Sequence, residues 1–133
     1  MKIEVKSIEY KISDLADNLV LYTTELNDEI ACSFFSAALG KVALARNANR
    51  EQLNQLIKEM NPNNLIEEGL IRVQIIGGDE SEKSQKYLEH LIAMLKTIDN
   101  HDNIINVVSL DTGTRFHSNS FELDCYHGGI RAI

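Results

Sequence analysis

The amino-acid sequence predicts an α+β fold, in which a mixed β-sheet or sandwich carries two main helices packed on one side. Short segments rich in β-branched and aromatic residues recur along most of the chain. Two other segments show the three-to-four-residue apolar spacing of a helix. The 133 residues, 44% of them apolar, contain no linker, repeat or low-complexity stretch, so we expect a single domain over residues 1–133.

Four strands are expected before the first helix. Their segments are residues 3–12, 18–24, 30–35 and 40–45. In the first segment the alternation of apolar and polar residues slips by one position at Lys6 and Ser7, which is typical of a β-bulge. Asn27 and Asp28 are turn residues between the second and third segments.

Capping residues mark the start of both predicted helices. Asn49 and Gln52 have the spacing of a capping box, and Pro62 stops this first helix. Ser81 or Asp79 can cap the second helix, which covers about residues 82–97. Its apolar stripe should be buried: Tyr87, Leu88, Leu91, Leu95 and Ile98. Its opposite face should be exposed: Lys83, Lys86 and His90.

The remaining strands are expected at residues 70–76, 104–110, 120–125 and 130–133. The first of these has bulky residues on both faces, which favours a central position in the sheet, and Gly77 and Gly78 end it. Asp111 and Thr112 end the second. Because one helix connects these two strands, we expect them to be adjacent and parallel, with both terminating loops at the same end.

Charge and composition exclude several classes of function. The net charge is −7 and no run of Lys and Arg occurs, so we expect no nucleic-acid partner. No apolar run approaches the roughly 20 residues that span a bilayer, which argues against membrane insertion. The first residues lack the apolar core of a signal peptide, so a cytoplasmic location is expected.

Neither a metal nor an organic cofactor is implied by the sequence. His, Cys, Asp and Glu do not occur with metal-ligand spacing, and no nucleotide-binding glycine motif is present. The two cysteines, Cys32 and Cys125, would be reduced in the cytosol, although the sequence leaves a bridge between them open.

Several motifs, taken in order, resemble the chemoreceptor glutamine deamidases, the CheD family. The matching pieces are Val73-Gln-Ile-Ile-Gly-Gly78, Val107-Val-Ser-Leu-Asp-Thr-Gly113, Ser120-Phe-Glu-Leu-Asp124 and Gly129-Ile-Arg-Ala-Ile133. The segment Ile30-Ala-Cys-Ser-Phe-Phe35 then falls where that family carries its nucleophile. The resemblance covers about residues 20–133 and implies a CheD-like fold. It also implies a cofactor-free hydrolase whose substrate is a glutamine side chain of a protein.

The resemblance assigns roles to individual residues. Cys32 would be the nucleophile, and Thr24, with Thr23 as the less favoured alternative, would orient the base or a water. Leu44 stands where the family has its catalytic histidine, so His117 is the first candidate for a replacement base. A histidine restored at position 44 is expected to increase the reactivity of Cys32. The resemblance places four further residues at the rim of the site: Gly77, Gly78, Asp111 and Thr112.

Each of these assignments has a structural alternative. Cys32 can be a buried core thiol, because free cysteine is among the most buried residue types. Gly77 and Gly78 can end a strand with positive φ, Asp111 can form an ordinary turn, and His117 can be an ordinary loop residue. The sequence therefore leaves the enzymatic status open. Its alternative function is a non-catalytic protein-binding module, with an acidic surface for a protein partner.

Overall fold

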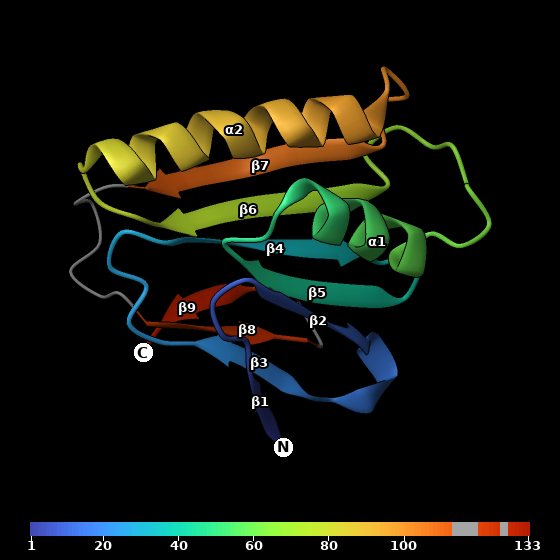
Figure 1. The fold of residues 1–133 in the computed structure, drawn as a ribbon. Coiled ribbons are helices and arrows are strands. Elements are labelled where there is room, and N and C mark those ends of the chain that lie inside the picture. Colours follow the sequence, from blue (N-terminus) through green and yellow to red (C-terminus); the bar gives the residue numbers. More distant parts are fainter. Residues whose placement is uncertain (113–119, 126–127) are drawn as a thin grey trace.

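The structure, a computed structural model, describes residues 1–112, 120–125 and 128–133. Its elements form three layers, with two helices above a five-stranded sheet and a four-stranded sheet below it (Figure 1). The helices are α1 (Arg50–Met60) and α2 (Glu82–Asp99). Both lie on the same side of the five-stranded sheet (Figure 1). The expected α+β class, with mixed sheets and two helices on one side, is confirmed.

The larger sheet has the strand order β2-β5-β4-β6-β7. Its strands are β2 (Glu9–Asp14), β5 (Lys41–Arg46), β4 (Ile30–Ser36), β6 (Ile71–Gly77) and β7 (Ile105–Thr112). The smaller sheet has the order β1-β3-β8-β9. Its strands are β1 (Lys2–Glu4), β3 (Val20–Thr23), β8 (Phe121–Asp124) and β9 (Ile130–Ala132). A short 3₁₀ turn, Leu15–Asp17, precedes β3.

The first predicted strand is in fact two strands in different sheets. β1 pairs in parallel with β3, whereas β2 pairs antiparallel with β5. The slip in alternation at Lys6 and Ser7 therefore marks a crossing between sheets and not a bulge. Val5, just before the crossing, is fully buried, and Ile8, just after it, has a positive φ of 56°.

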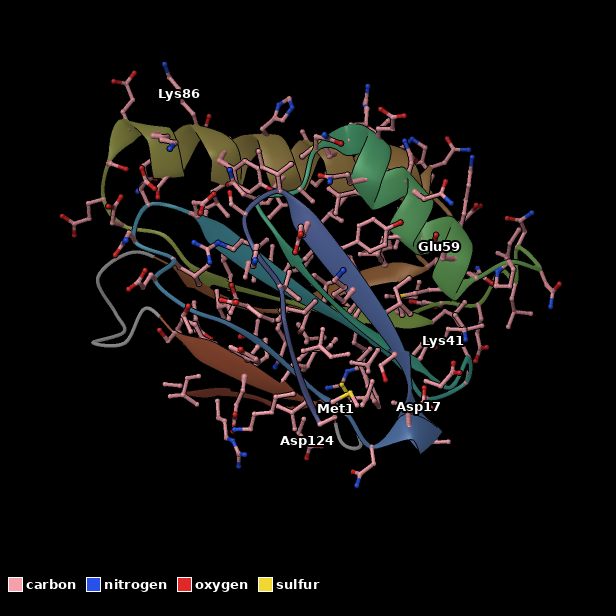
Figure 2. The ribbon with its side chains drawn as sticks, turned by 60° about the horizontal axis from the view of Figure 1, so that its bottom comes forward. Met1, Asp17, Lys41, Glu59, Lys86 and Asp124 are labelled. Carbon is pink, nitrogen blue, oxygen red and sulfur yellow. The ribbon has the colours of Figure 1, made fainter. Side chains whose placement is uncertain are left out.

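The helix predictions are confirmed. The Asn49 side chain accepts a hydrogen bond from the Gln52 backbone, and the Gln52 side chain accepts one from the Asn49 backbone. Ser81 caps α2. Leu91 and Leu95 of the α2 stripe are buried, and Tyr87, Leu88 and Ile98 are half-buried. The predicted exposed residues of α2 are exposed, and Lys86 projects from the outer surface (Figure 2). Neither described helix has the length and apolar character of a membrane span.

Two apolar clusters lie on opposite faces of the five-stranded sheet. The cluster under the helices contains Cys32 and Phe34 of β4 together with Leu91 of α2. The cluster between the sheets contains Ala31 of β4 and Leu44 of β5. Because neighbouring residues of a strand point to opposite faces, this division assigns each strand residue to one core or the other.

The β6–α2–β7 unit has the predicted topology. β6 and β7 are adjacent and parallel, with a register shift at Val73 and Gln74. Gly77 lies opposite Thr112, so the ends of both strands meet at one edge of the sheet.

Candidate functional site

Cys32 lies in the middle of β4, opposite Ala45 on β5 and Ile75 on β6. Its side chain is 1% exposed, and burial raises the pKa of the thiol to about 12. At neutral pH the sulfur is therefore held as the thiol, whereas the reactive form of cysteine is the thiolate. This environment favours the structural alternative for Cys32.

The phenol of Tyr87, on α2, is electrostatically coupled to Cys32. Burial raises the pKa of Tyr87, and negative charge at Cys32 would raise it further. The hydroxyl donates a hydrogen bond of 2.8 Å to the carbonyl oxygen of Ala48. Because this phenol keeps its proton, it cannot act as the base that would activate the thiol.

A histidine in place of Leu44 would not face Cys32. Leu44 pairs with Ser33, and its side chain belongs to the core between the two sheets. Cys32 belongs to the core under the helices, on the other face of the same sheet. The register thus contradicts the expectation that a histidine at position 44 would increase the reactivity of Cys32.

Thr24 belongs to a cluster around Arg46, at the end of β5. The Thr24 hydroxyl donates to Glu4 Oε2 at 3.4 Å, and its carbonyl oxygen accepts from Arg46 Nη1 at 2.6 Å. Arg46 pairs with Ala31 and therefore points to the face opposite Cys32. The structure thus does not bring Thr24 to the Cys32 sulfur.

Gly77 and Gly78 pack against the loop between β3 and β4. Their φ angles are 91° and 75°, a region that side chains disfavour. A Cβ at Gly77 would lie 2.6 Å from Leu26 Cδ1, and one at Gly78 would lie 2.9 Å from Ile30 Cγ1. The Gly78 amide donates to the Glu29 carbonyl oxygen at 2.8 Å. These contacts account for both glycines without a substrate.

The other predicted site residues lie near the end of β7 or beyond it. Asp111 is half-buried and accepts a hydrogen bond of 2.7 Å from the Ser109 hydroxyl. The backbone of Thr112 pairs with Gly77. His117 lies outside the described residues. Asp111 is thus the predicted site residue that the described structure places at a cavity.

Two adjoining cavities share Gln74, and we refer to them together as the polar hollow. Their volumes are 160 and 80 Å³. They lie on the face of the five-stranded sheet opposite the helices. The residues that give the hollow its chemical character are Ser33, Phe35, Arg72, Gln74, Ser109 and Asp111.

The hollow forms because the four-stranded sheet covers only part of the face that the five-stranded sheet turns toward it. Along β6, the alternate residues Arg72, Gln74 and Ile76 are exposed, half-buried and buried in that order. β6 has the central position expected for residues 70–76, between β4 and β7, and the Arg72 end of this face is exposed. The sequence signal for the hollow was the presence of polar residues at alternate positions of otherwise apolar strands.

The charges of the hollow are unevenly compensated. Asp111 is hydrogen-bonded to Ser109, and the guanidinium of Arg131 pairs with Glu122. Hydrogen bonds from Arg131 and Lys2 hold the pKa of Glu122 below its usual range, with Arg131 the larger cause. The guanidinium of Arg72 has no hydrogen bond or ion pair with any residue in the described part of the chain.

The thiol and metal chemistry of the described residues is limited. Cys32 and Cys125 are both buried and unbridged, and they lie in the two different cores. The five-stranded sheet therefore separates them, which answers the question of a disulfide between them. No group of three His, Cys, Asp or Glu side chains gathers as metal ligands would in the described ranges.

Comparison with known proteins gives a sequence relative and several structural neighbours, including one from Neisseria meningitidis and one from Bacillus licheniformis. No family model matches the chain. A crystal structure of Neisseria meningitidis protein NMB0706, of family DUF152, has a TM-score of 0.42 at 12% identity over 79% of this chain and 52% of that one. Bacillus licheniformis hypothetical protein YfiH has a TM-score of 0.38 at 11% identity over 71% of this chain and 50% of that one. The chain thus spans about half the length of each neighbour.

The sequence relative is the uncharacterized protein RC0132 of Rickettsia conorii. It is 54% identical over 69 residues, which make up 52% of this chain and 92% of that protein. Its description names no activity, so it does not bear on the resemblance to the glutamine deamidases. At this identity over nearly the whole relative, the chain belongs to the same family as RC0132.

Proposed function

We propose that this protein is a non-catalytic binding domain whose binding site is the polar hollow. The observation that carries the proposal is the division of β4 between two faces. Cys32 points into the core under the helices, and the next residue, Ser33, lines the hollow on the other side of the sheet. Of these two neighbouring residues, the one that lines the cavity therefore carries a hydroxyl and not the thiol.

The competing function is the cysteine-dependent deamidation of protein glutamine. That reaction requires a thiolate and a base within about 2.6–3.2 Å of the sulfur. Burial instead raises the pKa of Cys32 to about 12, and Leu44 faces the opposite core. Both observations argue against cysteine catalysis.

Alkylation of the native protein tests this proposal. Iodoacetamide near neutral pH should leave Cys32 unmodified while the protein is folded, and should modify it rapidly in denaturant. An Ala93→Cys variant supplies an exposed thiol on α2 as the control. Mass spectrometry of the peptide that contains Cys32 gives the rate.

Two outcomes would overturn the proposal. One is native alkylation of Cys32 at a rate close to that of the Ala93→Cys thiol. The other is release of ammonia from a glutamine-bearing protein that stops when Cys32 is replaced by alanine. A Leu44→His variant should alkylate no faster than the parent, because its imidazole would face the other core.

A further inference from the structure

We infer that the polar hollow receives a small carboxylate, which the guanidinium of Arg72 holds. This inference rests on the proposed binding function and adds the chemical class of the ligand. Its starting point is the guanidinium of Arg72, which has no partner among the described residues and lies at the open end of a cavity in a protein whose net charge is −7.

Arg72 is exposed, and it also borders a cavity. It sits on β6 between Phe35 of β4 and Asn106 of β7, and lines the 160 Å³ cavity. A planar guanidinium presents two parallel N–H groups that match the two oxygens of a carboxylate. No described carboxylate occupies this position.

Asp111 is too far along the sheet to neutralise Arg72. Asp111 lies opposite Ile76, four residues from Arg72 on the same strand. At about 3.3 Å per residue the two positions are roughly 13 Å apart, which exceeds the Debye length of about 8 Å at physiological ionic strength. The positive charge of Arg72 at the 160 Å³ cavity is therefore not neutralised by Asp111.

Ser33 and Gln74 add hydrogen-bond donors beside Arg72. The Ser33 hydroxyl is 3.5 Å from Gln74 Oε1, at the long limit of a hydrogen bond, so a ligand oxygen can compete for it. The amide nitrogen of Gln74 has no partner among the described residues. Three donor groups thus border one cavity, which favours an acceptor-rich ligand.

The remaining walls favour a short hydrocarbon tail. Phe35 and Val108 supply apolar surface, and Gly128 approaches the Phe35 ring so closely that a Cβ there would lie 2.3 Å from Cδ2. The volume of 160 Å³ is several times the ~30 Å³ share of one water. A carboxylate with a few carbon atoms fits both the volume and the walls.

Propionate and its uncharged isostere propionamide provide the test. Each is titrated into ¹⁵N-labelled protein at constant ionic strength, and the signals of the Gln74 side-chain amide and the Arg72 Nε–H are followed. Propionate should cause saturable shifts at these groups. The Arg72→Gln variant should bind it about tenfold more weakly or worse, as loss of a charged hydrogen bond requires. Arg50→Gln, an exposed arginine on α1, should bind like the parent.

The outcomes separate the inference from the proposed function. If propionamide binds as tightly as propionate, the carboxylate inference fails while binding in the hollow stands. If neither probe shifts these groups, both fail. Undiminished propionate binding by Arg72→Gln would overturn the role of Arg72. Tighter binding of inorganic phosphate than of propionate would replace the carboxylate with a different oxyanion.

Discussion

Replacing Arg46 by methionine should destabilise the fold more than any surface charge substitution. The Arg46 side chain is 11% exposed, and its partner Glu29 is 15% exposed. Arg46 donates to Glu29 Oε1 at 2.7 and 3.0 Å, to the Thr23 hydroxyl at 3.0 Å, and to the carbonyl oxygens of Thr24 and Glu25 at 2.6 and 3.0 Å. The Arg46 side chain thus connects the end of β5 to the loop between β3 and β4 through hydrogen bonds.

The magnitude follows from what methionine leaves behind. Removing one partner of a buried ion pair costs about 3–5 kcal/mol, because the other charge stays buried without compensation. Glu29 keeps a hydrogen bond from the Ser7 hydroxyl, which places the expected loss near the lower end of that range. With an unfolding entropy of about 2.1 cal/mol/K per residue, a loss of 3 kcal/mol lowers the Tm by roughly 10 °C.

Urea unfolding followed by circular dichroism measures the free energy of unfolding directly. Lys41→Met is the matched control, because Lys41 is a cation at the other end of β5 that pairs with the exposed Asp14. Exposed pairs contribute about 0–1 kcal/mol. The double variant Arg46→Met/Glu29→Met should recover part of the loss, since it also removes the stranded carboxylate.

A loss for Arg46→Met no larger than that for Lys41→Met would refute this reasoning. It would mean that water or neighbouring groups satisfy Glu29 and the freed carbonyl oxygens at little cost. The hydrogen bonds of Arg46 would then contribute little to holding the loop between β3 and β4.

Three further predictions concern packing and charge. Leu91→Ala should lower the free energy of unfolding by about 2–5 kcal/mol in urea melts, because the Leu91 side chain of α2 is fully buried against the sheet. A loss well under 1 kcal/mol would show that the apolar stripe of α2 is not part of the core. Gly128→Ala should cost about 1–3 kcal/mol, since its Cβ would overlap Phe35 at a positive φ, whereas Gly129→Ala, with open space around it, should be nearly neutral. The lowered pKa of Glu122 means that its stabilising contribution is present above the usual carboxyl range and is lost as the pH falls. Urea melts between about pH 3 and pH 7 should therefore show a shallower acid loss for Glu122→Gln than for the parent.

Local patterns determined most elements of this fold. The capping box at Asn49 and Gln52, the apolar stripe of α2 and the glycine pair after β6 all depend on residues close together in the chain. Their structural consequences can therefore be predicted without knowing the fold. The parallel pairing of β6 and β7 also follows from sequence, because a single helix between two apolar strands leaves few other connections.

Sequence order could not determine which strand faces share a core. Aligning Cys32 and Leu44 with a nucleophile and its base assumed that the two side chains meet. Their antiparallel register places them one position apart, and a shift of one position in a strand reverses the face of a side chain. The same limit applied to residues 3–12, where one slip in alternation is equally consistent with a bulge and with a crossing between sheets.

The polar hollow depended on tertiary structure for a related reason. Arg72 and Gln74 were visible as polar residues in an apolar strand, but their exposure is set by how far the four-stranded sheet extends over β6. That cover comes from strands at both ends of the chain, β1 and β3 together with β8 and β9. The sequence by itself determined the helices, most strands and the pairing of β6 with β7. Only the packing of the helices and the two sheets decided that Cys32 is buried and that Arg72 is exposed, because burial depends on contacts between residues far apart in the chain.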